Sequence, residues 1–448
     1  MKSLHRRQLL KASAGSLFIT PLLTSALASL SSVAIAATNQ QTLRIMLPAL
    51  PYFELLKQSI KKFASDNSIV VEIDVFPYLE MREIQLSELH KKQGKYDLII
   101  MLAAWKTEYA TLNLLTNLSK EQKSGRLKID DINDFIPAYL TVAGKVGGEK
   151  GYLDGPGAQL FALPLGADTS ILAYRSDIFK KHNWKPPVNY DELLALLPLI
   201  RKQEPTLIPL CSRGARGHQI THAWLLHFNA FGGEVFDKAW RPSIHNTAGI
   251  KAIETLKAIN ATTPGGILNN LFADAGNAFI TGSAAMYLDS STIFNIINDP
   301  VKSLVQDKVD FALHPKGTIH SSETGGFAIA VPKNTQRPAQ ALQMLATFTN
   351  KIQEKNIARK GGIPVRTSTL NDPQLQEIFP EYAVLAKQIE YANPNWRPII
   401  AEWAIINEQI LGTVIHDAVA GVITPAAALE QAEEKIKALM KSTGRYKT

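Results

Sequence analysis

Cysteine is almost absent from this sequence, in which Cys211 is the single example. One cysteine cannot form an intramolecular disulfide, and we expect Cys211 to be a small buried apolar side chain rather than a reactive thiol. Long hydrophobic runs are lacking after the N-terminal segment, so no later segment is apolar enough to span a membrane. These absences predict a soluble mature chain without disulfides.

Strong charge is lacking as well. The formal net charge is +8, and four of the basic residues lie within positions 1–11, which leaves +4 for the remainder. The lysines are scattered and form no basic stripe interleaved with aromatic residues, so we exclude nucleic acid as a partner. A hydrophobic content of 46% is sufficient for a large core, and the roughly 410 residues that follow the N-terminal segment correspond to two or three domains.

The sequence also lacks the motifs that identify common enzymes. It contains no Gly-x-Ser-x-Gly elbow, no Gly-Lys-Ser/Thr phosphate loop and no Gly-x-Gly-x-x-Gly fingerprint. His218 and His222 have the i,i+4 spacing of helical metal ligands, but no His-Glu-x-x-His motif and no cysteine pair accompanies them. We therefore expect a protein that is not an enzyme and that holds no cofactor and no metal.

The N-terminus has the pattern of an export signal. Residues 1–11 are basic without an acidic residue, residues 12–33 are apolar, and Ala34-Ile35-Ala36 is a small-x-small site. This pattern predicts a signal over residues 1–36 that is cleaved near Ala36-Ala37. A membrane anchor is the alternative, but Pro21 and several Ser and Thr residues make a poor spanning helix.

The same segment leaves two export routes open. Arg6-Arg7 resembles a twin-arginine motif, although paired arginines also occur in ordinary secretory signals. No cysteine stands at the cleavage site, where a lipoprotein would carry one. We therefore expect the mature protein to be periplasmic.

Apolar strands and amphipathic helices alternate along the mature chain. Residues 43–47, 71–75 and 96–101 have the pattern of strands, and Leu56, Ile60 and Phe63 mark one face of a helix between the first two. The continuous apolar run after Tyr96 is typical of a central parallel strand. This alternation predicts an α/β fold with mostly parallel sheets.

Five segments, in this order, resemble the bacterial extracellular solute-binding proteins of family 1, which include the maltose- and other sugar-binding proteins of ABC importers. They are 96–100 (YDLII), 161–187 (with FALPLGAD, LAYRSDIF and WKPP), 231–236 (FGGEVF), 279–286 (FITGSAAM) and 325–333 (GGFAIAVPK). The resemblance covers about residues 43–440. It implies a periplasmic substrate-binding protein that captures a small solute, expected to be a mono- or oligosaccharide, by hinge closure. The expected partners are that solute and the permease subunits of an ABC transporter, and the protein is expected to be a monomer.

The resemblance further implies a two-lobed periplasmic-binding-protein fold, in which each lobe is a mostly parallel sheet flanked by helices and the ligand lies in the cleft. The first lobe is expected to comprise residues 38–168 and 317–360. The second lobe is expected to comprise residues 169–316 and 361–448.

Eight residues are expected to contact the solute. Asp168 lies at the crossover between the lobes, where maltose-type members place a sugar-binding carboxylate, although a hinge-capping role is the alternative. Trp105 and Tyr52 follow strands, at the edge where open α/β sheets bind ligands, and core packing is the alternative for both. The remaining candidates, which the resemblance places near the cleft, are His222, Asp289, Gly325, Arg366 and Trp403.

Two departures from maltose-type members leave the solute open. Ala104 stands where those proteins carry an acidic residue, and residues 289–294 lack their stacking tryptophan. Arg366 could pair with an anionic sugar such as a uronate, or form an interlobe salt bridge. Two alternatives are a secreted carbohydrate-active enzyme with Asp168 and Asp289 as its two carboxylates, and the same fold with a polyamine, a phosphate ester or a metal chelate as ligand.

Overall fold

The computed structural model describes residues 42–66, 69–78, 80–147 and 157–446. The predicted export signal, residues 1–36, lies outside the described residues. Of the helices in the described part of the chain, not one has the length and apolarity that a membrane crossing requires.

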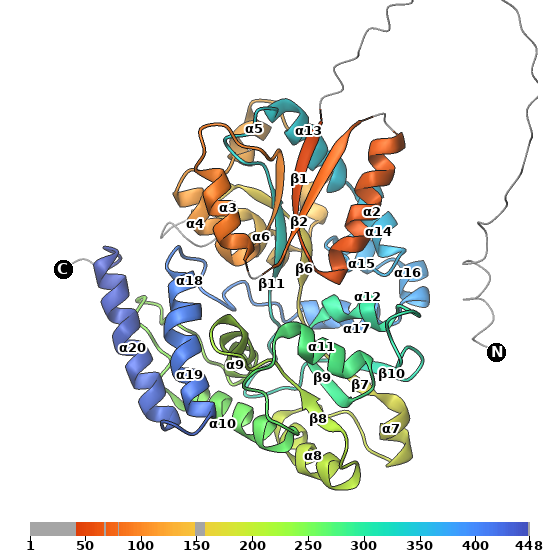
Figure 1. Cartoon of the computed structure of the whole chain (residues 1–448), viewed down its shortest axis with the longest axis vertical. Coiled ribbons are helices and arrows are strands. Elements are labelled where there is room, and N and C mark those ends of the chain that lie inside the picture. Colours follow the sequence, from red (N-terminus) through yellow and green to blue (C-terminus); the bar gives the residue numbers. More distant parts are fainter. Residues whose placement is uncertain (1–41, 67–68, 79, 148–156, 447–448) are drawn as a thin grey trace, which may run out of the picture. The chain divides into compact units, whose positions relative to one another are not determined.

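A five-stranded sheet with the order β2-β1-β3-β11-β6 forms around the predicted apolar runs (Figure 1). Its strands are β1 (Leu43–Pro48), β2 (Val71–Phe76), β3 (Leu98–Leu102), β6 (Ala162–Asp168) and β11 (Gly325–Ala330). Every residue of β3 is buried, as expected for a strand covered on both faces. β1 is parallel to β2 and β3, whereas β11 is antiparallel to both of its neighbours.

A second sheet, with the order β10-β7-β9-β8, also combines parallel and antiparallel strands. Its strands are β7 (Ser170–Arg175), β8 (Ile208–Cys211), β9 (Ala284–Ser290) and β10 (Val309–Ala312). β8 and β9 are parallel, and β7 is antiparallel to both β9 and β10. Each sheet therefore has one strand that runs against the others. A two-stranded ribbon of β4 (Lys145–Val146) and β5 (Gln159–Leu160) completes the strands of the described residues.

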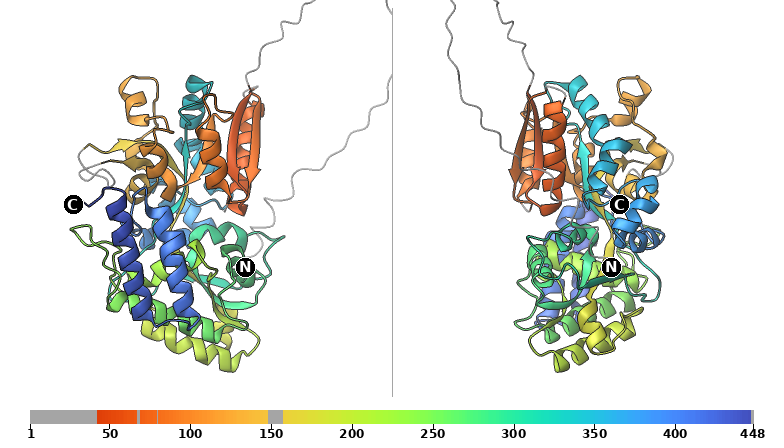
Figure 2. Two further views of the ribbon diagram at one scale, coloured as in Figure 1. Left: turned by 60° about the vertical axis from the view of Figure 1, so that its left-hand side comes forward. Right: turned by 90° about the vertical axis from the view of Figure 1, so that its right-hand side faces the viewer.

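The chain crosses between the two sheets at closely spaced points. β6 ends at Asp168 and β7 begins at Ser170, so only Thr169 separates them. The return crossing lies between β10 and β11, and the side chains of Thr169 and Ser322 hydrogen-bond to each other where the two crossings meet. Figure 2 shows the sheets and these connections from two further directions.

Helices flank both sheets, and their ends follow local capping chemistry. The first group is α2 (Pro51–Asp66), α3 (Met81–Leu89), η1 (Ala103–Trp105), α4 (Lys106–Thr111), α5 (Leu118–Lys123), η2 (Ile132–Asp134), α6 (Pro137–Gly144), α7 (Ser176–Lys181), α8 (Tyr190–Gln203), α9 (His218–Ala230), α10 (Thr247–Thr262) and α11 (Phe272–Ile280). The second group is η3 (Ser291–Ile293), α12 (Phe294–Ile297), α13 (Pro338–Phe348), α14 (Lys351–Ala358), α15 (Thr367–Leu370), α16 (Pro373–Ile378), α17 (Glu381–Ile389), α18 (Trp403–Ile405), η4 (Ile406–Leu411), α19 (Gly412–Val419) and α20 (Pro425–Ser442). In α8, for example, the Asn189 side chain accepts a hydrogen bond from the Glu192 amide at 2.9 Å.

Two hydrophobic cores correspond to the two sheets. One surrounds the five-stranded sheet, and the other packs α9, α10, α19 and α20 against the second sheet. The first core also contains Phe279, Phe294 and Tyr382, which lie in segments predicted to belong to the second lobe. Because these contacts cross the predicted lobe boundaries, the boundaries stay a prediction. Cys211 is buried in the first core, as expected, and burial raises the pKa of its thiol.

Candidate ligand-binding site

A cavity of about 620 Å³, part of it open to solvent, is lined by residues of both sheets. Several lining residues end or follow strands, as Leu50 follows β1, Tyr78 follows β2, and Leu102 ends β3. The cavity therefore lies at the carboxyl edge of the sheet, where open α/β sheets bind ligands. The other lining residues are Tyr52, Asp168, Arg213, His218, His222, Phe272, Ser290, Thr292, Ile296, Glu323, Gly326, Phe327 and Arg397.

Three of the eight predicted residues line this cavity: Tyr52, Asp168 and His222. Asp168 is the last residue of β6, and its Oδ2 accepts a hydrogen bond from the hydroxyl of Ser290. Burial raises the pKa of Asp168 to about 7, and the neighbouring carboxylate of Glu323 adds to the increase. Tyr52 lies on α2, and its ring packs edge-on against Phe53 with centroids 5.0 Å apart.

Two further predicted residues lie directly behind the cavity wall. Asp289, on β9, is bound through both carboxylate oxygens by Arg213, with 2.7 Å between Arg213 Nε and Asp289 Oδ2. A Cβ atom on Gly325 would lie 3.0 Å from both Arg397 Nη2 and Glu323 Oε1, and 3.2 Å from Asp168 Oδ1. Glycine at position 325 thus permits these three charged side chains to converge.

The last three predicted residues do not line the cavity. Trp105 ends the 3-10 turn η1 and lies in the first core, where its ring is 6.4 Å from that of Tyr109. Trp403 begins α18 and is buried in the second core. Both tryptophans pack in a core, and core packing was the alternative considered for Trp105.

Arg366 is also away from the cavity, and its side chain is completely buried. Its guanidinium donates hydrogen bonds to the carbonyl oxygens of Asp130, Asp131 and Thr349 at 2.6 to 2.9 Å and lies 4.0 Å from the centre of the Phe135 ring. These partners join Arg366 to segments expected in the first lobe, and the arrangement is that of a structural arginine.

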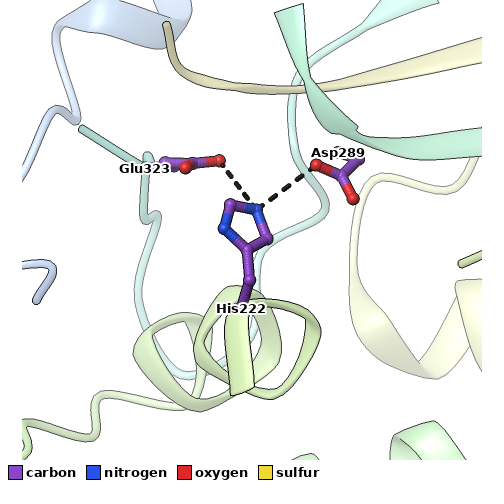
Figure 3. A group of neighbouring side chains, drawn as sticks. All are labelled: His222, Asp289 and Glu323. Carbon is purple, nitrogen blue, oxygen red and sulfur yellow. Dashed lines mark ion pairs between the residues drawn. The ribbon is translucent and has the colours of Figure 1, made fainter. Parts of the chain in front are cut away.

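Charged side chains meet in a cluster beside the cavity, and three of them, His222, Asp289 and Glu323, are drawn in Figure 3. Nε2 of His222 lies 3.3 Å from Asp289 Oδ1 and 3.4 Å from Glu323 Oε2. Glu323 Oε1 in turn accepts a hydrogen bond from Arg397 Nη2 at 3.0 Å. Burial alone would raise the pKa of Asp289, but the Arg213 guanidinium outweighs burial and holds this pKa below its ordinary value. The pKa of Glu323 is likewise lowered, because His222 and Arg397 outweigh the effect of its burial.

The family of the chain follows from sequence comparison. Residues 50–355 match the family described as bacterial extracellular solute-binding protein. The chain belongs to this family. The resemblance inferred from the five sequence segments is thereby confirmed.

Relatives of this solute-binding protein are identical to it at about a quarter of the aligned positions. A probable amino-acid ABC transporter periplasmic-binding protein of Sinorhizobium fredii is 24% identical over 445 residues, which cover 96% of this chain and 97% of the relative. A mannitol-binding protein of Pseudomonas aeruginosa is 25% identical over 308 residues, which cover 64% of this chain and 70% of the relative. Both relatives are named as binding proteins.

Solved structures show the same fold. An ABC transporter solute-binding protein of Agrobacterium radiobacter in complex with ribitol superimposes with a TM-score of 0.78 at 24% identity, over 89% of this chain and 98% of that one. One of Agrobacterium vitis with bound D-mannitol superimposes with a TM-score of 0.77 at 23% identity, over 90% and 99%. The predicted two-lobed periplasmic-binding-protein fold is confirmed.

Four buried polar atoms in the cluster of this solute-binding protein have no hydrogen-bond partner among the described residues. They are Asp168 Oδ1, His222 Nε2, Glu323 Oε2 and Arg397 Nε. His222 Nε2 and Glu323 Oε2 face each other as an ion pair, whereas Asp168 Oδ1 and Arg397 Nε belong to cavity-lining residues. Buried polar atoms are normally satisfied, so these atoms are candidates for contacts with a ligand. The four atoms offer both acceptors and donors to a ligand.

Sequence reasoning missed Arg213, Glu323 and Tyr78. Arg213 follows the end of β8 and Tyr78 follows the end of β2, so the rule that selected Tyr52 and Trp105 applied to both. Glu323 lies just before β11, two positions from the predicted residue Gly325, and no sequence pattern singled it out. Its place in the cluster depends on the direction of that strand.

Proposed function

We propose that this protein is the periplasmic substrate-binding subunit of an ABC importer and that its solute is a small neutral polyhydroxylated molecule, a monosaccharide or a polyol. The observation that carries the proposal is the set of four unpartnered buried atoms at the cavity. Hydroxyl groups both donate and accept hydrogen bonds, so one polyol can satisfy carboxylate and guanidinium atoms together.

The charges around the cavity favour a neutral solute over the other ligand classes. A polyamine would meet the guanidinium groups of Arg213 and Arg397, and a phosphate ester would meet Asp168, Asp289 and Glu323. Both cost electrostatic energy in a buried site. The relatives that bind mannitol and ribitol support the same class.

The arrangement of the crossings supports capture by hinge closure. Ligand-facing atoms come from β6, α9 and the segment that precedes β11, which belong to both halves of the fold. A ligand shifts an open–closed equilibrium only through different contacts in the two states, and contacts to both halves provide this difference. The proposal also includes three expectations from the sequence: ABC permease subunits as partners, a monomeric protein and a periplasmic location.

Catalysis is not part of the proposal. Of the two carboxylates considered for a carbohydrate-active enzyme, Asp289 is held through both oxygens by Arg213. A general acid or nucleophile needs an oxygen free to reach the substrate. The bidentate contact therefore favours a binding role for the cavity.

A thermal-shift screen tests the proposed function. The purified protein is heated with D-mannitol, ribitol, D-tagatose or maltose, and with amino acids, uronates, polyamines and phosphate esters for comparison. We expect one polyol or monosaccharide to stabilise the fold by about 2.7 kcal/mol at a concentration 100-fold above its Kd. A shift with amino acids or polyamines alone, or turnover of a glycoside, would show that the proposed solute class is wrong.

A further inference from the structure

His218 is the first residue of α9, and it lines the cavity. Tyr78, which follows β2 of the first sheet, lies against it edge to face, with the two ring centroids 6.3 Å apart. His222, one turn further along α9, is buried, whereas His218 is half-buried. His218 therefore keeps access to the cavity at the place where the two halves of the fold meet.

A single turn of π-helix, η4, holds the His218 ring from behind. Nδ2 of the buried Asn407 lies 2.9 Å from Nδ1 of His218. The backbone carbonyl of Asn407 accepts a hydrogen bond from the Thr221 hydroxyl at 2.8 Å. At the other end of the turn, a Cβ atom on Gly412 would lie only 2.3 Å from Gly217 Cα, so the backbones of α9 and α19 are in close contact there. Asn407 and His218 are thus fixed relative to each other, and π-helical turns are frequent at functional sites.

The contact with Asn407 determines which nitrogen of the His218 ring carries a proton. An amide NH2 group can only donate, so the Nδ1 atom that it meets must accept and carries no proton. Burial lowers the pKa of His218 well below its ordinary value, and the positive charges of Arg213 and Arg397 add to this effect. The ring is therefore neutral at pH 7, and its one proton is on Nε2. Among the described residues, Nε2 has no hydrogen-bond partner.

We propose that Asn407 is a positioning residue that fixes His218 as the Nε2–H tautomer, and that this N–H donates a hydrogen bond to an oxygen atom of the solute. The donation to the solute rests on the proposed function, whereas the tautomer does not. A neutral N–H donor requires a solute group that accepts a hydrogen bond. His218 therefore favours a hydroxyl, ether or carbonyl oxygen at this position and disfavours an ammonium group, which only donates.

Long-range ¹H–¹⁵N NMR spectra of the ¹⁵N-labelled protein test the tautomer, because they show which ring nitrogen is protonated. His218→Gln identifies the His218 signals by their loss. We expect the Nε2–H form in the wild type at pH 7. Asn407→Asp replaces the donor with a carboxylate that accepts from Nδ1, so it should protonate Nδ1. A merely structural role of Asn407 would not move the proton.

Two results would overturn the role of Asn407. One is an Nδ1–H or doubly protonated His218 in the wild type, and the other is an unchanged tautomer in Asn407→Asp. If that variant does not fold, the wild-type spectrum decides, since Asn407 is the hydrogen-bond partner of Nδ1 among the described residues.

Calorimetric titration with D-mannitol and with ribitol tests the contact with the solute. His218→Gln and His218→Asn form a matched pair, because the amide nitrogen of Gln can take the place of Nε2 and that of Asn the place of Nδ1. We expect affinity within about two-fold of the wild type for His218→Gln and about ten-fold weaker binding for His218→Asn. The exposed His245, changed to Gln, is the control and should leave the affinity unchanged.

Equal affinity in the wild type and His218→Asn would overturn the contact between His218 and the solute. A wild type that binds neither polyol would overturn that contact together with the proposed function. The NMR spectra are measured without solute, so they test the positioning by Asn407 separately, and the two failures are distinguishable.

Discussion

Replacing Asp168 with Asn is the sharpest test of the cavity as a solute site. The change keeps the size of the side chain and an oxygen that can accept the hydrogen bond from Ser290, whereas it removes the charge and places an amide NH2 group, a donor, where the acceptor Oδ1 stands. A hydrogen bond to a charged group contributes about 1.5–3 kcal/mol. If Asp168 Oδ1 binds a solute hydroxyl, the variant should therefore bind the solute about 10- to 150-fold more weakly.

The stability of the same variant should change little. The carboxyl group of Asp168 is buried beside Glu323, and repulsion between the two disappears when one becomes an amide. We expect the melting temperature of the unliganded variant to stay within about 2 °C of the wild type. The affinity is measured by calorimetric titration with the polyol or sugar that raises the melting temperature of the wild type most. The stability is measured by differential scanning calorimetry.

An exposed aspartate provides the matched control. Asp310 lies on β10 with its side chain exposed, so Asp310→Asn removes a charge without touching the cavity. It should alter neither affinity nor stability. Unchanged solute affinity in Asp168→Asn together with a large fall in melting temperature would refute the reasoning and assign Asp168 to the hinge.

Two other perturbations test structural roles. Arg366→Met removes a buried guanidinium that binds three carbonyl oxygens, so urea denaturation should show a loss of about 3–5 kcal/mol in unfolding free energy, with unchanged solute affinity; weakened solute binding in a stable variant would contradict this role. Burial lowers the pKa of His314 to about 4, below its ordinary value of 6.5, although Glu323 opposes the change and His320 adds to it. Because the folded pKa is depressed, the neutral ring stabilises the fold above pH 6.5, and about 3 kcal/mol is lost as pH falls from 6.5 toward 4. His314→Gln should reduce the pH dependence of the urea midpoint over that range without abolishing it, because burial also lowers the pKa values of His218 and His227. An unchanged pH profile would show that other groups control it.

Local features of the fold were accessible from sequence because they depend on neighbouring residues. The pair Thr424-Pro425 is a typical sequence pattern for the start of a helix, and Thr424 Oγ1 accepts a hydrogen bond from the amide of Ala427 at 3.2 Å at the start of α20. The apolar run after Tyr96 likewise predicted β3, which is buried along its whole length. Hydrophobic period and capping chemistry determine both.

The candidate site was only partly accessible, because its contacts join distant segments. Arg213 and Asp289 are 76 positions apart, and Glu323 and Arg397 are 74 apart. No local pattern indicates either pair. Trp105 shows the converse case, since it follows a strand as a ligand-binding residue would but does not line the cavity. The chain turns at once into η1 and directs the ring into the core.

The direction of β11 explains why Glu323 faces Asp168. A strand parallel to β6 would begin at the opposite edge of the sheet, and a residue before it would lie far from the cavity. β11 is antiparallel to β6, with Gly325 opposite Asp168, so the segment before β11 meets the end of β6. Both crossings between the sheets therefore present a carboxylate to one cavity. A solute that contacts Asp168 and Glu323 together would hold the two crossings in one arrangement, which couples solute binding directly to the hinge.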